Sequence, residues 1–212
     1  MRKLMAVILV IFSPLMVHAE EITIAALGDS LTQGYGLPPD DGLVPQLQRW
    51  LNGQGAEVHL INAGVSGDTT AGGAARVGWT LTPDVDAMIV TLGGNDLLRG
   101  IDPAEARRNL ETILKAAGSA QVPVLLIGMR APGNYGPEYK AEFEANYADL
   151  AQQYGTLFLP DFFAGLGGGG DPAALRAWFQ QDGIHPNAQG VARIVASIGP
   201  SVLDLAARAR AD

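Results

Sequence analysis

The sequence predicts a three-layer α/β/α fold, in which a five-stranded parallel sheet carries helices on both faces. Five short apolar runs alternate with segments whose apolar residues recur at the helical period. Such alternation predicts parallel strands, because a parallel connection needs a crossover that is usually a helix. Five strands fit the doubly wound, flavodoxin-like arrangement, in which sites form outside the carboxyl ends of the strands.

The expected elements follow from these patterns in chain order. The apolar runs predict strands at Ile22–Leu27, Val58–Asn62, Val85–Leu92, Val122–Ile127 and Thr156–Leu159. The periodic segments predict helices at Asp41–Asn52, Pro103–Ala117, Pro137–Tyr154, Asn187–Ser197 and Ser201–Arg210. A further helix is expected within Asp68–Thr80, although the glycines there lower its helix propensity.

Residues 1–19 have the layout of a secretory signal peptide. Arg2 and Lys3 precede the fourteen-residue apolar stretch Leu4–Val17, and small residues follow around Ala19. This stretch is short for a membrane span, and an uncleaved anchor is the alternative interpretation. We expect cleavage after Ala19, a mature chain that forms a single domain over residues 20–212, and a periplasmic or secreted location.

The expected mature chain is acidic and contains no cysteine. Removal of residues 1–19 takes away two basic residues and no acidic ones, which leaves 12 basic and 22 acidic side chains and a formal charge of −10. An acidic chain is poorly suited to bind nucleic acid or anionic lipid, so we expect no nucleic-acid partner. We also expect no stable membrane anchor after cleavage, since no other stretch is predicted to span a bilayer. The lack of cysteine excludes thiolate metal sites and thiol nucleophiles.

Four polar segments are the places to look for chemistry. Gly28–Gly34, Asn62–Asp68 and Gly93–Asp96 follow the first three predicted strands, and Asp182–Pro186 precedes a predicted helix near the carboxyl terminus. The first three are rich in glycine, which lets a backbone approach a ligand closely. All three come at carboxyl ends of strands, so they are expected to meet at one edge of the sheet.

His185 is the candidate base of this site. His18 leaves with the signal peptide, and His59 lies inside the second predicted strand, where we expect its side chain to face a helix layer. Pro186 favours an extended backbone at His185, directly before a helix. Asp182, three residues earlier, can reach the imidazole Nδ1 and fix its tautomer. The alternative is that Asp182 only begins an Asx-turn.

Since there is no cysteine, the candidate nucleophile is a serine. Ser119, Ser197 and Ser201 lie in or beside predicted helices, away from the strand ends. Ser66 follows a strand but could cap the next helix. Ser30 directly follows the most apolar strand and is the better candidate. The Gly-x-Ser-x-Gly elbow of the α/β-hydrolases is absent, which argues against that fold.

These segments, in this order, resemble the signature blocks of the GDSL-type SGNH hydrolase family. The four matching blocks are Gly28-Asp29-Ser30-Leu31, Gly64, Gly94-Asn95-Asp96 and Asp182-x-x-His185-Pro186. Longer runs are similar to the arylesterase branch, which includes multifunctional periplasmic thioesterase/lysophospholipase enzymes; they are Asn62–Thr70, Leu92–Asp96, Asn134–Pro137 and Asp182–Asn187. The resemblance spans nearly the whole mature chain and implies the SGNH hydrolase fold.

The resemblance implies a serine esterase that needs no cofactor and no metal. Ser30 would be the nucleophile, His185 the general base and then acid, and Asp182 the carboxylate that orients the imidazole. The oxyanion hole would consist of the backbone N–H groups of Ser30 and Gly64 and the side-chain amide of Asn95. A neutral amide donates a hydrogen bond without any change of protonation.

The natural substrate is the open part of this expectation. Aryl and alkyl esters, lysophospholipids and acyl thioesters all fit the resemblance, and carboxyl esters rank first because an acidic exported chain gains nothing from an anionic acyl-CoA. Leu97, Tyr135 and Ile184 either line the substrate pocket or belong to the core. Leu97 stands where close relatives often carry glycine, and its larger side chain could narrow that pocket.

Two other functions remain open on the sequence alone. One is a flavodoxin-like FMN carrier, in which Ser30-x-Thr32-x-Gly34 would hold a phosphate. Asp29 would repel that phosphate, and the same turn lacks the Gly-x-Gly-x-x-Gly of dinucleotide-binding domains. The other is a carbohydrate acetylesterase on the same scaffold, which would differ only in its substrate.

Overall fold

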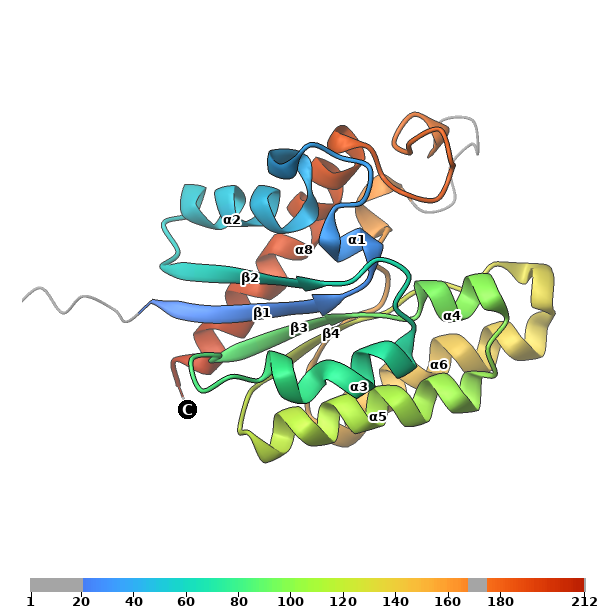
Figure 1. Cartoon of the computed structure of the whole chain (residues 1–212), viewed down its shortest axis with the longest axis horizontal. Helices are drawn as coiled ribbons and strands as arrows, with labels where there is room; N and C mark the ends of the chain where they lie inside the picture. Colours follow the sequence, from blue (N-terminus) through green and yellow to red (C-terminus); the bar gives the residue numbers. More distant parts are fainter. Residues whose placement is uncertain (1–20, 168–174, 212) are drawn as a thin grey trace, which may run out of the picture.

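Five parallel strands form the central sheet in the order β2-β1-β3-β4-β5 (Figure 1). The computed structural model describes residues 21–167 and 175–211, so the expected signal peptide lies outside the described residues. The strands are β1 (Ile22–Gly28), β2 (Val58–Gly64), β3 (Ala87–Thr91), β4 (Val124–Ile127) and β5 (Leu157–Leu159). The predicted five-stranded parallel sheet is confirmed, and the strand order, which pattern could not supply, is the flavodoxin-like one.

Helices cover both faces of this sheet. α2 (Leu43–Gly53) and α8 (Ala188–Ala209) pack together on one face, whereas α3 (Thr70–Thr80), α5 (Pro103–Ser119) and α6 (Pro137–Tyr154) form the layer on the other (Figure 1). Two short helices that the sequence did not predict, α1 (Ser30–Gln33) and α4 (Gly94–Arg99), follow β1 and β3 directly. Single 3₁₀ turns occupy Pro39–Asp41, Gly133–Tyr135 and Ala164–Leu166.

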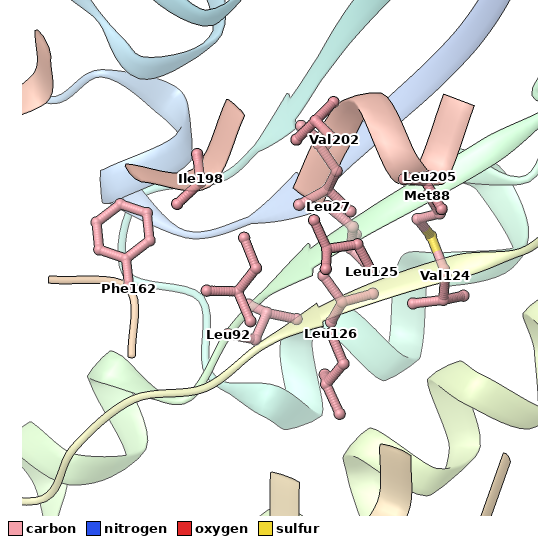
Figure 2. Packing of buried hydrophobic residues seen from close by; sticks show 14 of the residues in the cluster. Leu27, Met88, Leu92, Val124, Leu125, Leu126, Phe162, Ile198, Val202 and Leu205 are labelled. Carbon is pink, nitrogen blue, oxygen red and sulfur yellow. The ribbon is translucent and has the colours of Figure 1, made fainter. Parts of the chain in front are cut away.

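The core fills both faces of the sheet, with α8 on one face and α5 and α6 on the other. Figure 2 shows Ile198, Val202 and Leu205 of α8 over the strand residues Leu27 and Met88, and all five are buried. Burial of side chains of this size stabilises a fold by roughly 1.5–3 kcal/mol each. Because the strands are covered on both faces, they read as continuous apolar runs, which is why the sequence identified them.

The expected break in the last helical region is wrong. α8 continues through Pro200, although proline removes one helical hydrogen bond. Its buried residues keep one stripe across the proline, from Val191 to Ile198 and on to Leu205, so tertiary packing outweighs the local cost. By length and composition α8 could also span a membrane, contrary to expectation, but half of that window is buried inside the protein. It is a core helix of the described unit.

β2 is an edge strand, and its exposed side differs from expectation. Val58 and Leu60 are buried under α2, whereas His59 between them is exposed, because α3 covers β1 and leaves the outer face of β2 open. The expectation that His59 faces a helix layer is therefore wrong. Gln48 of α2 closes the strand edge by donating to the Val58 carbonyl (2.7 Å) and accepting from the Leu60 N–H (2.8 Å). These bonds occupy groups that an edge strand otherwise offers to another chain.

Candidate active site

The turn after β1 presents Ser30 at the carboxyl edge of the sheet. β1 ends at Gly28, and the buried Asp29 caps α1 by accepting a hydrogen bond from the Leu31 N–H (3.0 Å). Ser30 is the first residue of α1, and its side chain is partly exposed. N–H groups in the first turn of a helix have no acceptor within that helix, so the Ser30 N–H is not used by α1.

His185 contacts both of its predicted partners. Its Nε2 lies 2.9 Å from the Ser30 Oγ, and its Nδ1 lies 2.7 Å from the Asp182 Oδ2. The His185 carbonyl accepts a hydrogen bond from the Gln180 N–H (2.7 Å), and the Tyr35 ring packs against the imidazole with centroids 4.7 Å apart. The structure thus brings together three residues that the sequence separates by up to 155 positions.

Asp182 contacts the imidazole and also begins an Asx-turn. Its Oδ1 accepts from the N–H groups of Ile184 (2.9 Å) and His185 (3.0 Å), which is an Asx-turn, and Gly183, directly after Asp182, has a φ of 68° that favours glycine. The other oxygen stays with the imidazole. The hydrogen bond from His185 and the two backbone N–H groups lower the pKa of Asp182 to about 2, so the carboxylate stays ionised at neutral pH.

Gly64 and Asn95 lie at the same edge, and their donors already have partners. The Gly64 N–H donates to the Asn62 Oδ1 (2.9 Å). The Asn95 Nδ2 donates to the Asp68 carbonyl (2.9 Å) and, more distantly, to the Asp29 Oδ2 (3.3 Å). An ester oxygen at this edge would therefore share or replace one of these acceptors.

Gly64 also has a steric reason to be glycine. A Cβ there would lie 2.3 Å from the Gln33 nitrogen and 2.9 Å from the Asp29 carbonyl oxygen, so no side chain fits. The segments after β1 and β2 therefore pack backbone against backbone. This contact keeps the Ser30 turn and the Gly64 peptide side by side.

Asp29 is a buried carboxylate beside these groups. Its exposed fraction is 1%, and burial raises its pKa to about 6, against the lowering effects of the Leu31 N–H, the positive charge of His185 and the Asn95 amide. Asp29 therefore changes charge in the mildly acidic range.

A cavity of about 430 Å³ opens beside Ser30 and His185. Leu97, Tyr135 and Ile184 line it, as the pocket interpretation of these residues predicted. Leu97 is buried and also belongs to the core cluster, whereas Tyr135 and Ile184 are each more than two-fifths exposed. The lining is mostly apolar and includes Leu31, Leu98, Met129 and Phe163. Such a cavity suits the acyl or alcohol part of an ester.

Comparison with known proteins assigns the family. Residues 26–193 match the model of the GDSL-like Lipase/Acylhydrolase family. The chain belongs to this family. It is 37% identical to "Esterase TesA" of Pseudomonas aeruginosa over 184 residues, which cover 86% of this chain and 89% of that protein. It is 35% identical over 168 residues to "Thioesterase 1/protease 1/lysophospholipase L1" of Escherichia coli, covering 78% and 76%.

A solved structure gives the same family. The SGNH-hydrolase family esterase AlinE4 superposes with a TM-score of 0.72 at 41% identity, over 88% of this chain and 97% of that one. The family, fold and esterase class inferred from the motifs are therefore confirmed: the chain is a carboxylic ester hydrolase of the GDSL/SGNH type. The FMN-carrier alternative is not supported.

Two polar residues of this GDSL hydrolase were missed by sequence reasoning. Asp96 is fully buried and accepts from the Thr70 N–H (2.8 Å) and hydroxyl (2.6 Å), which ties α4 to the start of α3. Arg76 contacts Asp68 and two strand-end carbonyls. Asp96 stood within a recognised block, whereas Arg76 belongs to no motif whose spacing would indicate a role. Among the described residues, no three His, Asp or Glu side chains cluster so as to hold a metal.

Proposed function

We propose that this GDSL hydrolase cleaves carboxyl esters by two-step acyl transfer through Ser30. The observation that carries the proposal is the continuous hydrogen-bonded path from the Ser30 Oγ through His185 to Asp182. A serine is a weak nucleophile at its ordinary pKa and needs an adjacent base that a third group orients. The path supplies both.

In the first step, the Ser30 Oγ attacks the ester carbonyl while its proton moves to the His185 Nε2. The carbonyl π electrons move onto the carbonyl oxygen, which becomes an oxyanion bonded to the tetrahedral carbon. The intermediate then expels the alcohol oxygen, which takes the proton from Nε2, and an acyl-enzyme remains. Water repeats the sequence: it gives its proton to Nε2, attacks the acyl carbon, and the Ser30 Oγ leaves with that proton.

Three donors would stabilise the oxyanion: the N–H groups of Ser30 and Gly64 and the amide of Asn95. The Asn95 Nδ2 carries two hydrogens. The short bond to the Asp68 carbonyl holds one and orients the amide, and the long contact to Asp29 (3.3 Å) leaves the other for the substrate. The Gly64 N–H would turn from the Asn62 Oδ1 or be shared with it.

We rank aryl and alkyl carboxyl esters first as substrates, ahead of lysophospholipids and acyl-CoA thioesters. The cavity is mostly apolar, and the chain's negative charge disfavours a highly anionic thioester. We further propose that residues 1–19 direct export and are removed, so that the single domain over residues 20–212 works in the periplasm or outside the cell. Amino-terminal sequencing of the exported protein tests this cleavage.

The assignment of Ser30 is tested by comparing three serine variants on p-nitrophenyl butyrate. Ser30→Ala is expected to abolish turnover and labelling by a fluorophosphonate, whereas Ser66→Ala retains both. Ser119→Ala, on the exposed end of α5, is the control for serine loss. Turnover by Ser30→Ala within tenfold of the wild type would refute the mechanism. A panel of acyl lengths, with acetylated sugars, lysophosphatidylcholine and acyl-CoA as further arms, ranks the substrates.

A further inference from the structure

Arg76 joins the ends of two strands to the segment before α3. It lies in the middle of α3, with a side chain 22% exposed. Its Nε donates to the Asp68 Oδ2 (2.6 Å), and its two terminal nitrogens donate to the carbonyls of Ala63 (2.7 Å) and Gly28 (2.8 Å). Arg76 does not line the cavity beside Ser30, so any role in the reaction is exerted through these three partners.

The Ala63 contact acts on the peptide that bears one proposed oxyanion donor. The Ala63 carbonyl and the Gly64 N–H belong to the same peptide plane, which is rigid. A cation held on the oxygen therefore fixes the direction of the N–H on the other side of that plane. It also polarises the peptide, which makes the N–H a stronger donor.

The other two contacts reach the remaining donors. The Asp68 carboxylate is held by Arg76, and the carbonyl of Asp68 is the 2.9 Å acceptor that orients the Asn95 amide. The Gly28 carbonyl lies two residues before Ser30, where β1 ends. One guanidinium thus contacts the segments of Ser30 and Gly64 directly and reaches the Asn95 amide through Asp68.

We propose that Arg76 is a positioning residue of the oxyanion hole, which rests on the proposed acyl-transfer mechanism. Its planar fork matches three acceptors in different directions, a geometry that a lysine ammonium on a flexible stem does not reproduce. Loss of the fork removes one of the contacts that hold the Gly64 peptide and the Asp68 segment, so that both can shift. Misplacement by about 1 Å far from the reacting atoms can cost on the order of 100-fold in rate.

Arg76→Gln and Arg76→Lys test the proposal against the control Arg107→Gln. Arg107 lies on α5 in the same helix layer, 34% exposed, and pairs with Asp149 at 3.6 Å. kcat and KM are measured on p-nitrophenyl butyrate, with the affinity of an alkyl boronic acid, whose tetrahedral adduct with the serine places an oxygen in the oxyanion hole.

We expect Arg76→Gln to lower kcat by about 10- to 100-fold, with KM within about twofold of the wild-type value. The affinity for the boronic acid should fall in the same proportion as kcat. The kcat of Arg76→Lys is expected to lie between those of Arg76→Gln and the wild type, and the kcat of Arg107→Gln should match the wild type. Thermal midpoints are recorded for each, and assays are run well below them. If Arg76→Gln does not fold, the Lys variant carries the test on the same criteria.

Three outcomes would overturn the positioning role. They are a kcat within threefold of the wild type whatever the thermal midpoint, a rise in KM without loss of kcat, and an equal loss in Arg107→Gln. Failure of this proposal is distinguishable from failure of the proposed function. In the first case Ser30→Ala is inactive while Arg76→Gln is normal, and in the second Ser30→Ala itself turns over.

Discussion

Replacement of Asp29 by asparagine is expected to stabilise the protein relative to the wild type, by an amount that grows as the pH rises. Burial raises the folded-state pKa of Asp29 from 3.8 to about 6. The folded protein therefore holds this proton more tightly than the unfolded chain does. Between about pH 4 and pH 6 the unfolded chain gives up the proton first, so the free energy of unfolding falls as the pH rises through this window.

The size of the effect follows from the shift of the pKa. One pKa unit corresponds to about 1.4 kcal/mol, so the ionised Asp29 costs about 3 kcal/mol at pH 7 and about 0.5 kcal/mol at pH 4. Asparagine keeps an oxygen for the Leu31 N–H and cannot ionise. Because this asparagine does not titrate, the stability gap between Asp29→Asn and wild type should widen by about 2 kcal/mol from pH 4 to pH 7.

Urea unfolding and thermal melts at half-unit steps from pH 4 to pH 8 measure this gap. In a chain of this length about 2 kcal/mol corresponds to a midpoint shift of roughly 4–8 °C. Asp84→Asn, an exposed position, controls for loss of a formal charge and is expected to change stability by less than about 0.5 kcal/mol throughout. A gap for Asp29→Asn that stays constant across the window would refute the claim that burial holds this proton.

Three further substitutions test the site. Asp182→Asn is expected to lower kcat about 100- to 10,000-fold, because the amide neither fixes the tautomer nor stabilises the imidazolium; stopped-flow or steady-state kcat within threefold of wild type would contradict this. Asn95→Ala should lower kcat about 100- to 1,000-fold with little change in KM. An effect confined to KM would show that Asn95 binds the substrate and does not stabilise the oxyanion. Leu97→Ala should lower the free energy of unfolding by about 2–3 kcal/mol and raise kcat/KM for dodecanoate relative to butyrate esters; an unchanged ratio would exclude Leu97 from the acyl pocket.

The sheet was predictable because both of its faces are covered. Buried strands such as β1 read as continuous apolar runs, and each strand found lies within its predicted run or extends it by one or two residues. The errors arose where packing overrode a local signal. Pro200 lies inside α8 because the buried stripe continues across it, and His59 is exposed because no helix covers the outer face of the edge strand.

The types of residue in the site and their order along the chain were predictable, whereas their hydrogen-bond partners were not. Ser30, Gly64, Asn95 and His185 stand in recognisable blocks. The first three meet because their strands end at one edge, whereas His185 joins them from the loop before α8. That Asn62 occupies the Gly64 N–H is a matter of rotamer and turn geometry. No spacing rule states which side chain will occupy a given backbone group.

The contacts of Arg76 explain why such positioning escapes sequence reading. Two of its three acceptors are backbone carbonyls, which every residue possesses, so the Gly28 and Ala63 positions carry no mark of the bond in their side chains. For Asp29 the side chain itself is visible in the Gly-Asp-Ser-Leu motif, but its raised pKa results from burial, which the motif does not show. Both features depend on the same burial that made β1 easy to recognise. The apolar environment strengthens the hydrogen bonds that hold the proposed oxyanion donors, and it also opposes ionisation of Asp29 beside them. Asp29→Asn removes the cost of burying a carboxylate and also replaces the oxygen that accepts from the Asn95 amide, so a gain in stability and a loss in kcat should appear together in that variant.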